Sequence, residues 1–117
     1  MRRLFPVLLA LAGLSASPAL AADGAKTFML QCKTCHAAKS GPMGPSLTGV
    51  AGRKIAGLSD YKYSAGLTAK GAQTWTDANL DAYLAAPAKF APGTRMMTGL
   101  AVPADRAAVI GYLKGLK

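Results

Sequence analysis

The sequence is short of acidic residues and lacks glutamate altogether. Its 117 residues include 14 lysines and arginines against five acidic residues, all of them aspartate, so the formal net charge is +9. We expect part of this charge to keep the surface solvated and part to steer the protein toward acidic partner surfaces. Nucleic acid is not an expected partner, because the lysines are scattered and no pattern of aromatic and basic residues repeats.

Cysteine and histidine are also scarce. The two cysteines and the single histidine all belong to one segment, Cys32-Lys33-Thr34-Cys35-His36. A zinc site needs about four ligands, which is more than this segment offers. A C-x-x-C thiol oxidoreductase needs flanking strands, usually in a βαβ pattern, and no part of the sequence alternates strand and helix. An oxidising compartment would still allow a disulfide between the two thiols.

The spacing C-x-x-C-H is the attachment signature of c-type haem. Cys32 and Cys35 can form thioether bonds to the haem vinyl groups, and His36 would then be the proximal iron ligand. This hypothesis is favoured over zinc and over thiol chemistry. If the segment holds one covalent haem c, no thiol is left for a disulfide and no histidine for another metal.

The N-terminus has the pattern of an export signal. Arg2 and Arg3 form a basic start, residues 4–14 are mostly apolar, and Ala19-Leu20-Ala21 has the small-x-small pattern of a signal peptidase site. We therefore predict a cleaved signal peptide at residues 1–21 and a periplasmic protein. The alternative, an uncleaved membrane anchor, is weaker because a spanning helix needs about 20 continuous apolar residues.

Residues 22–117 are long enough for one small domain. Apolar residues at helical spacing predict three main helices, which cover residues 24–35, residues 76–86 and the chain from Pro103 onward. A proline disfavours helical geometry in the residue before it, so Pro87 is expected to end the second of them. No strand pattern competes with this all-α assignment.

Two long loops are expected between these helices, at residues 37–64 and 88–102, with a short helix at 64–70. Glycine and proline punctuate the first loop throughout. Long loops in a compact domain are usually functional or wrapped around something. We therefore expect an all-α fold in which long loops enclose a haem.

Several motifs along residues 24–117 together resemble class I cytochrome c of the mitochondrial and bacterial periplasmic type. They are Cys32-x-x-Cys35-His36, Gly44-Pro45-Ser46-Leu47, Gly52-Arg53-Lys54, Tyr63, Trp75, Tyr83-Leu84 ahead of Pro87, Pro92-Gly93-Thr94-Arg95-Met96 and Gly111-Tyr112-Leu113-Lys114. The resemblance implies the small cytochrome c fold, with three main helices and long loops around one covalent haem.

The resemblance also implies both iron ligands. His36 would be proximal and Met96 distal, whereas the adjacent Met97 does not fit the family spacing. Methionine–histidine ligation raises the haem potential. The second ring nitrogen of His36 would donate to the carbonyl oxygen of Pro45, which fixes the tautomer and the orientation of the ring.

Further side chains are assigned to the cofactor by the same resemblance. Arg53, Tyr63 and Trp75 would hydrogen-bond the buried haem propionate, Thr94 would bond the other propionate, and Tyr83 would lie near the distal sulfur. A carboxylate removed from water costs several kcal/mol unless it is paired, which gives these donors a physical purpose. Plain core packing is the alternative for the two buried aromatic residues.

The chain departs from the family pattern in its loops. The loop between His36 and Pro45 is shorter than in mitochondrial members, Thr98 stands where the family has an aromatic residue, and Leu67 stands where many members have asparagine. These changes are expected to alter the exposure of the haem edge and the potential. They leave the attachment and ligand residues untouched.

The expected function is that of a soluble periplasmic electron carrier and not of an enzyme. With both axial positions filled, no open position remains for a substrate. Its partners would be redox proteins with acidic docking faces: membrane cytochrome complexes, oxidases, and periplasmic reductases or dehydrogenases. Only transient contact with the membrane surface is expected, and the protein would be a monomer. Around the haem edge the cations would be Lys33, Lys39, Lys89 and Arg95.

Two alternatives remain open from the sequence. A dedicated electron-accepting subunit of one periplasmic dehydrogenase would use the same haem in a different assembly. A peroxidase-like or gas-binding haem protein would need an open or labile sixth position on the iron.

Overall fold

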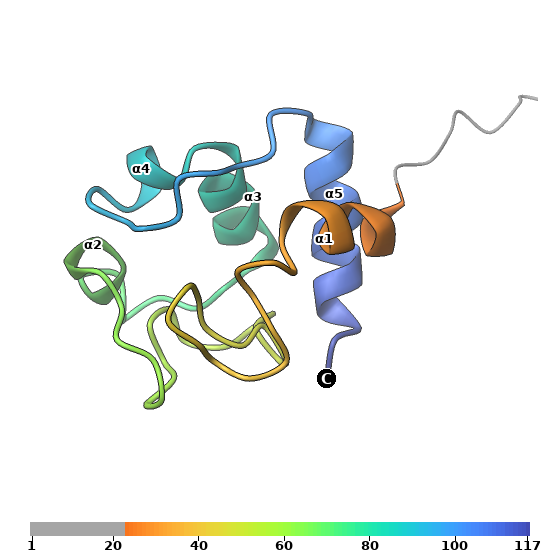
Figure 1. Cartoon of the computed structure of the whole chain (residues 1–117). Helices are drawn as coiled ribbons and strands as arrows, with labels where there is room; N and C mark the ends of the chain where they lie inside the picture. The colour runs from red at the N-terminus through yellow and green to blue at the C-terminus, as the bar shows by residue number, and fades with distance from the viewer. Residues whose placement is uncertain (1–22) are drawn as a thin grey trace, which may run out of the picture.

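The computed structural model describes residues 23–117, so the predicted signal peptide lies outside the described residues and stays a prediction. The helices are α1 (Gly24–Gln31), α2 (Ala65–Thr68), α3 (Asp77–Ala85), α4 (Pro87–Phe90) and α5 (Pro103–Lys114) (Figure 1). Over residues 23–117 there are only isolated β-bridges and no strand, which confirms the all-α prediction. None of the described helices has the length and hydropathy needed to cross a bilayer.

The first helix is shorter than predicted. It ends at Gln31 because the carbonyl oxygen of Phe28 accepts hydrogen bonds from the backbone N–H groups of both Cys32 and Lys33, each at 2.9 Å. The bond from Lys33 spans five residues and closes a π-turn, a form that occurs at helix C-termini. Residues 32–35 therefore form a turn, and the prediction of helix through this segment was wrong.

The third helix starts where its sequence predicts. The hydroxyl of Thr76 accepts a hydrogen bond from the backbone N–H of Asn79 at 3.1 Å, and Asp77 lies in the positively polarised first turn. Pro87 ends α3 as predicted, but it also begins α4, which the sequence analysis missed. Proline suits the first position of a helix because a backbone N–H there would have no intrahelical acceptor, so nothing is lost by its absence.

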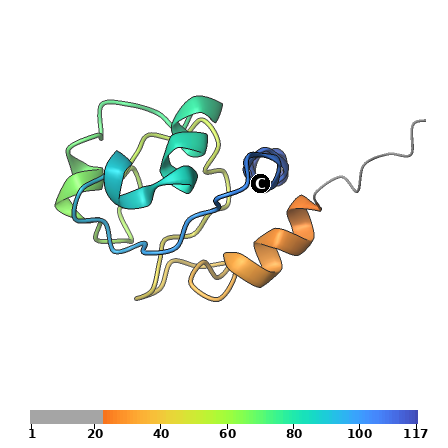
Figure 2. The same ribbon diagram turned by 90° about the horizontal axis from the view of Figure 1, so that it is seen from above.

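Helices α1 and α5 cross at close range (Figures 1 and 2). A Cβ atom on Gly24 would lie 2.1 Å from the carbonyl oxygen of Ala108, so only glycine allows this approach. The rings of Phe28 and Tyr112 pack beside it with centroids 4.9 Å apart. This crossing joins the two ends of the described chain and leaves the long loops on one side of it.

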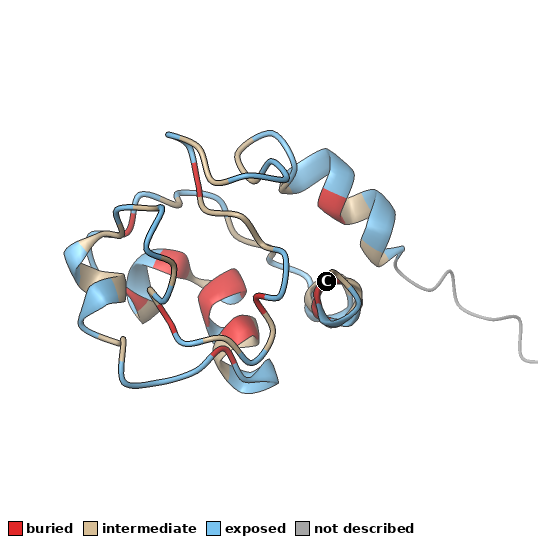
Figure 3. Cartoon of the chain, turned by 90° about the horizontal axis from the view of Figure 1, so that it is seen from below, coloured by how far each residue is buried: buried red, intermediate tan, exposed pale blue. Residues whose placement is uncertain are grey.

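The buried residues concentrate on α3, α5 and several positions in the loops, whereas α1 buries only Phe28 (Figure 3). The apolar stripe of α3 consists of Leu80, Tyr83 and Leu84. From α5 come Val109, Ile110 and Leu113. Residues of both helix faces and of the loops line the cavity that forms the candidate site.

Candidate cofactor site

One cavity of about 360 Å³ collects the residues that the sequence singles out. Such a volume is typical of a site for a small molecule or cofactor. Its lining includes every predicted cofactor contact and iron ligand: Cys32, Cys35, His36, Pro45, Arg53, Tyr63, Trp75, Tyr83, Thr94 and Met96. The core residues Phe28, Leu80 and Val109 add an apolar wall.

His36 is oriented by a backbone contact. Its Nδ1 lies 2.9 Å from the carbonyl oxygen of Pro45, which is the contact that the resemblance implies. A ring that donates through Nδ1–H keeps the lone pair on Nε2, and neutral imidazole is the form that binds metals. Burial lowers the pKa of His36 and so favours this neutral form, although the hydrogen bond to Pro45 acts in the opposite direction.

The loop can pass this close to the imidazole because residue 44 is glycine. A Cβ atom on Gly44 would lie 3.0 Å from two atoms of the His36 ring and 2.9 Å from the carbonyl oxygen of Cys35. Any side chain there would push the loop away from the ring. Gly44 therefore makes the bond between His36 and Pro45 sterically possible.

Both cysteines are free thiols that line the cavity beside His36. Burial raises the pKa of Cys32, and the nearby Cys35 raises it further. A nucleophilic cysteine of a thiol oxidoreductase has a lowered pKa instead. The surroundings of Cys32 thus argue against the thiol-enzyme alternative.

On the other side of the cavity, Met96 is held by a short polar relay. The hydroxyl of Thr94 accepts a hydrogen bond from the backbone N–H of Met96 at 3.3 Å, and it shares a 2.7 Å hydrogen bond with the hydroxyl of Tyr83. Met96 is half-buried, whereas 84% of Met97 is exposed. Tyr83 on α3 thus holds Thr94, and Thr94 holds the backbone of Met96.

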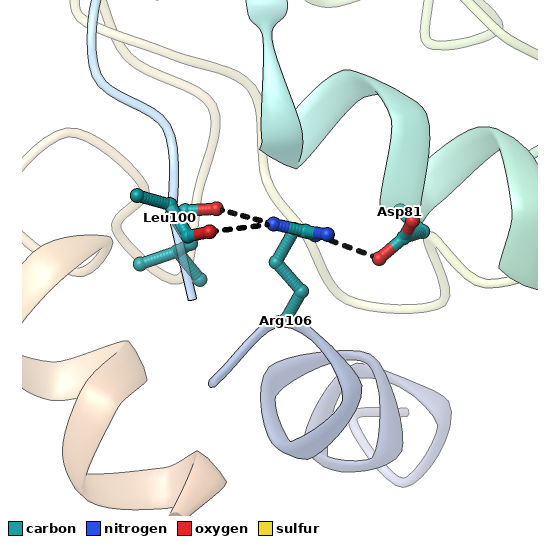
Figure 4. A network of polar contacts seen from close by, with 4 residues as sticks. Asp81, Leu100 and Arg106 are labelled. Atoms are coloured by element: carbon teal, nitrogen blue, oxygen red, sulfur yellow. Dashed lines mark hydrogen bonds and ion pairs between the residues drawn. The ribbon is translucent and has the colours of Figure 1, made fainter. Parts of the chain in front are cut away.

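The chain after Met96 is anchored by an arginine that the sequence analysis did not single out (Figure 4). Arg106 donates through Nη1 to the carbonyl oxygens of Leu100 and Ala101, at 3.0 and 3.1 Å. Its Nε donates to the Asp81 carboxylate at 2.8 Å. Only 13% of the Arg106 side chain is exposed. One residue of α5 thus joins α3 to the loop that carries Met96.

Arg53 supplies the test of whether a haem propionate fits the cavity. Its Nη1 and Nη2 donate to the carbonyl oxygens of Thr48 and Ser46, at 3.2 and 3.1 Å. Its Nε is buried and has no partner among the described residues. A buried donor without a partner needs an explanation, and a carboxylate in the adjoining cavity would satisfy it. The cavity and its donors therefore fit a flat apolar cofactor with acidic groups.

The predicted aromatic contacts are found at the same cavity. Trp75 is buried and packs against Tyr83, with ring centroids 5.2 Å apart. The hydroxyl of Tyr63 accepts a hydrogen bond from the backbone N–H of Leu58 at 3.3 Å, which leaves its own hydrogen available to a ligand. Tyr61, which was not predicted from the sequence, also lines the cavity and lies edge-on to Tyr63, with ring centroids 5.0 Å apart.

Comparison with known proteins identifies the family. The family model described as Cytochrome c matches residues 21–117. The chain belongs to the cytochrome c family. This cytochrome c is 46% identical over 98 residues to cytochrome c2 iso-2 of Magnetospirillum fulvum, a match that covers 81% of this chain and 100% of the relative.

Solved structures support the same assignment. The chain resembles cytochrome cH from Methylobacterium extorquens with a TM-score of 0.73 and 40% sequence identity, over 81% of this chain and 97% of that one. Ferricytochrome c2 from Rhodopseudomonas palustris gives a TM-score of 0.74 and 34% identity, over 80% and 96% of the two chains. The prediction of a class I monohaem cytochrome c with the small all-α fold is confirmed.

The cofactor prediction is confirmed at the same level. Within this family, the arrangement of Cys32, Cys35 and His36 fits one covalent haem c. As a class I cytochrome c, the protein is an electron carrier. The individual roles of the cavity residues remain predictions.

Proposed function

We propose that this cytochrome c is a periplasmic carrier of single electrons whose iron is ligated by His36 and Met96. The observation that carries the proposal is that both side chains line the same cavity. His36 is held there by Pro45 and the backbone of Met96 by Thr94. The bound haem c would supply a one-electron Fe(III)/Fe(II) couple.

In this proposal, the remaining cavity residues bind the cofactor and exclude water. Cys32 and Cys35 form the thioether bonds. Arg53, Tyr63 and Trp75 hold the buried propionate, and the unpaired Nε of Arg53 is the support for this assignment. His36 and Met96 would together ligate the iron and leave no position on it for a substrate, so the protein would be an electron carrier and not an enzyme.

The same cavity has an exposed rim, which is the proposed route for electrons. Met43 and Met97 line the cavity, although 68% and 84% of their surfaces are exposed. Thr98 is exposed there too and carries no aromatic ring that could cover the rim. An edge of the cofactor that emerges at these residues would bring a partner within reach of the electron.

The proposed partners are redox proteins with acidic docking faces, such as membrane cytochrome complexes, oxidases, and periplasmic reductases or dehydrogenases. The excess of cations supports this choice. Arg95 lines the cavity and is exposed, and Lys33, Lys39 and Lys89 are exposed as well. Complementary charge chiefly raises the rate of encounter, so electron transfer to such a partner should slow as added salt screens the charges.

The near-infrared band of ferric haem–methionine coordination tests this proposal directly. We expect the haem-loaded protein to show the band at neutral pH, Met96→Ala to lose it with a lower potential, and Met97→Ala to keep both. Met97 is a suitable control because it is adjacent in sequence and mostly exposed. A wild-type protein without the band would refute the ligand set, and it would favour an open sixth position.

A further inference from the structure

The peptide unit that binds His36 is itself bound on its other side. The carbonyl oxygen of Pro45 faces Nδ1 of His36 at 2.9 Å. The N–H of the same peptide unit belongs to Ser46, and it donates to the hydroxyl oxygen of Ser40 at 2.9 Å. Ser40 in turn donates its own proton to Oδ1 of Asp60 at 3.0 Å. A continuous chain of hydrogen bonds thus runs from the imidazole to a carboxylate.

Each bond in this chain points the same way. The three donors are Nδ1 of His36, the N–H of Ser46 and the hydroxyl of Ser40, and all of them point away from the side of His36 that would bind iron. The Pro45–Ser46 peptide between them is a conjugated unit. Electron density that Asp60 supplies to the Ser40 hydroxyl makes that oxygen a better acceptor for the Ser46 N–H. The polarised peptide then carries more negative charge on the Pro45 oxygen. Hydrogen bonds in such chains strengthen one another by about 10–30% each.

We propose that Ser40 and Asp60 tune the iron of this cytochrome c through the Pro45–Ser46 peptide unit and His36. A stronger acceptor at Pro45 draws the Nδ1 proton of His36 and makes the imidazole more basic as a ligand. A more basic ligand stabilises Fe(III) more than Fe(II), because the ferric ion carries the larger positive charge. Ser40 and Asp60 therefore act as positioning and tuning residues that lower the potential.

The inference rests on the proposed role of His36 as an iron ligand, but it does not depend on Met96. The chain of bonds is also local to the long loop between α1 and α2, since both Ser40 and Asp60 lie in that loop. Asp60 is exposed, so water and salt weaken its effect through space. A contribution relayed through hydrogen bonds is screened much less.

Two variants separate relayed charge from other effects. Ser40→Ala breaks the chain and leaves the charge of Asp60 in place. Asp60→Asn removes the charge, and its amide oxygen can still accept from Ser40, so the loop stays tethered. Ser59→Ala is the matched hydroxyl control, because Ser59 is exposed and adjoins Asp60. Ser40→Thr keeps the hydroxyl and should restore wild-type behaviour.

The measurements are optical redox titration of the haem-loaded proteins and the NMR resonance of the His36 Nδ1 proton in the ferrous state. We expect Ser40→Ala and Asp60→Asn each to shift the ferric–ferrous equilibrium about twofold toward Fe(II), a rise of about 20 mV at 59 mV per tenfold. Both should move the Nδ1 proton upfield. The double variant should not exceed the larger single effect, since both changes break one chain.

Other outcomes would overturn the inference. A shift in Asp60→Asn without one in Ser40→Ala would mean that the carboxylate acts through space. A shift in Ser40→Ala without one in Asp60→Asn would mean that Ser40 only tethers the loop. The near-infrared band of each protein is recorded as well, because it reports ligation by Met96. A failure of the Met96 proposal would appear in this band, whereas a failure of the present inference would appear in the His36 proton resonance and the potential.

Discussion

Replacing Arg106 with glutamine is expected to loosen the loop that follows Met96 more than it disturbs the rest of the fold. The arginine makes one hydrogen bond to Asp81 and two to the carbonyl oxygens of Leu100 and Ala101. Because Asp81 is 49% exposed, its ion pair contributes up to about 1 kcal/mol. The bonds from a charged donor to the two carbonyls add about 1 kcal/mol after the released oxygens are hydrated.

We therefore expect the Arg106→Gln change to lower the free energy of unfolding by about 2 kcal/mol, which corresponds to a fall in Tm of about 8–16 °C for a domain of this size. The matched control is Lys114→Gln. Lys114 also joins α5 to α3, through a 2.8 Å ion pair with Asp77, but the two side chains are 54% and 63% exposed. An exposed pair of this kind contributes about 0.5 kcal/mol or less.

Urea unfolding of the haem-loaded proteins, followed by two probes, is the assay. Far-ultraviolet circular dichroism reports the helices, and the near-infrared band reports the proposed ligation by Met96. In Arg106→Gln we expect the band to disappear at a lower urea concentration than the helical signal, because the loop opens first. Equal stabilities for Arg106→Gln and Lys114→Gln, or loss of both signals together, would refute a specific role for Arg106 in holding the loop.

Three further changes test individual contacts. Gly44→Ala should displace the loop from the His36 ring, because the new Cβ atom would lie 3.0 Å from two ring atoms. Unfolding of the haem-loaded protein, followed by circular dichroism, should show a loss in the free energy of unfolding of about 1–3 kcal/mol. An unchanged free energy of unfolding would contradict the close approach of the loop to the ring. Arg53→Gln should lower the potential in a redox titration, by up to about 59 mV for a tenfold effect, because the charge opposite the propionate is lost; an unchanged value would argue against that pairing. Burial raises the pKa of Tyr83 above 10.0, so the folded protein keeps the phenol protonated while the unfolded chain ionises. The contribution of Tyr83 to the free energy of unfolding should thus be present below about pH 10 and be lost above it. In denaturation experiments, the free energy of unfolding of Tyr83→Phe should fall less steeply with alkaline pH than that of the wild type. Equal slopes for the two proteins would count against burial of the phenol.

The main helices were predictable because their signals are local. Thr76 and Pro87 mark the two ends of α3 within its own sequence, and the apolar spacing gives its buried face. The early end of α1 was not predictable, because apolar spacing continues through Cys32 and Cys35 while the hydrogen bonds of Phe28 already close the helix. The short helix α4 was missed because four residues carry too little periodicity to read.

The candidate site was likewise predictable where its residues are neighbours in the sequence and less so where they are not. Cys32, Cys35 and His36 are contiguous, and their spacing alone predicts covalent haem. The choice of Met96 over Met97 came from family spacing, and the half-buried and exposed states of the two side chains agree with it. The assignment of Thr94 to a propionate stays a prediction, and the bond between its hydroxyl and that of Tyr83 is a contact that spacing alone did not predict.

What the sequence determined by itself is therefore the chemistry that depends on neighbouring residues: the attachment motif, the helix caps and the family. The tertiary structure decided which distant groups meet. Arg106 on α5 reaches Asp81 on α3, and Asp60 reaches Ser40 across a loop that carries no periodic pattern. The path of such loops is set by packing against the helices and the cofactor cavity, and hydrogen-bond partners follow from that path. Only the folded chain could therefore reveal how the proposed iron ligands are held.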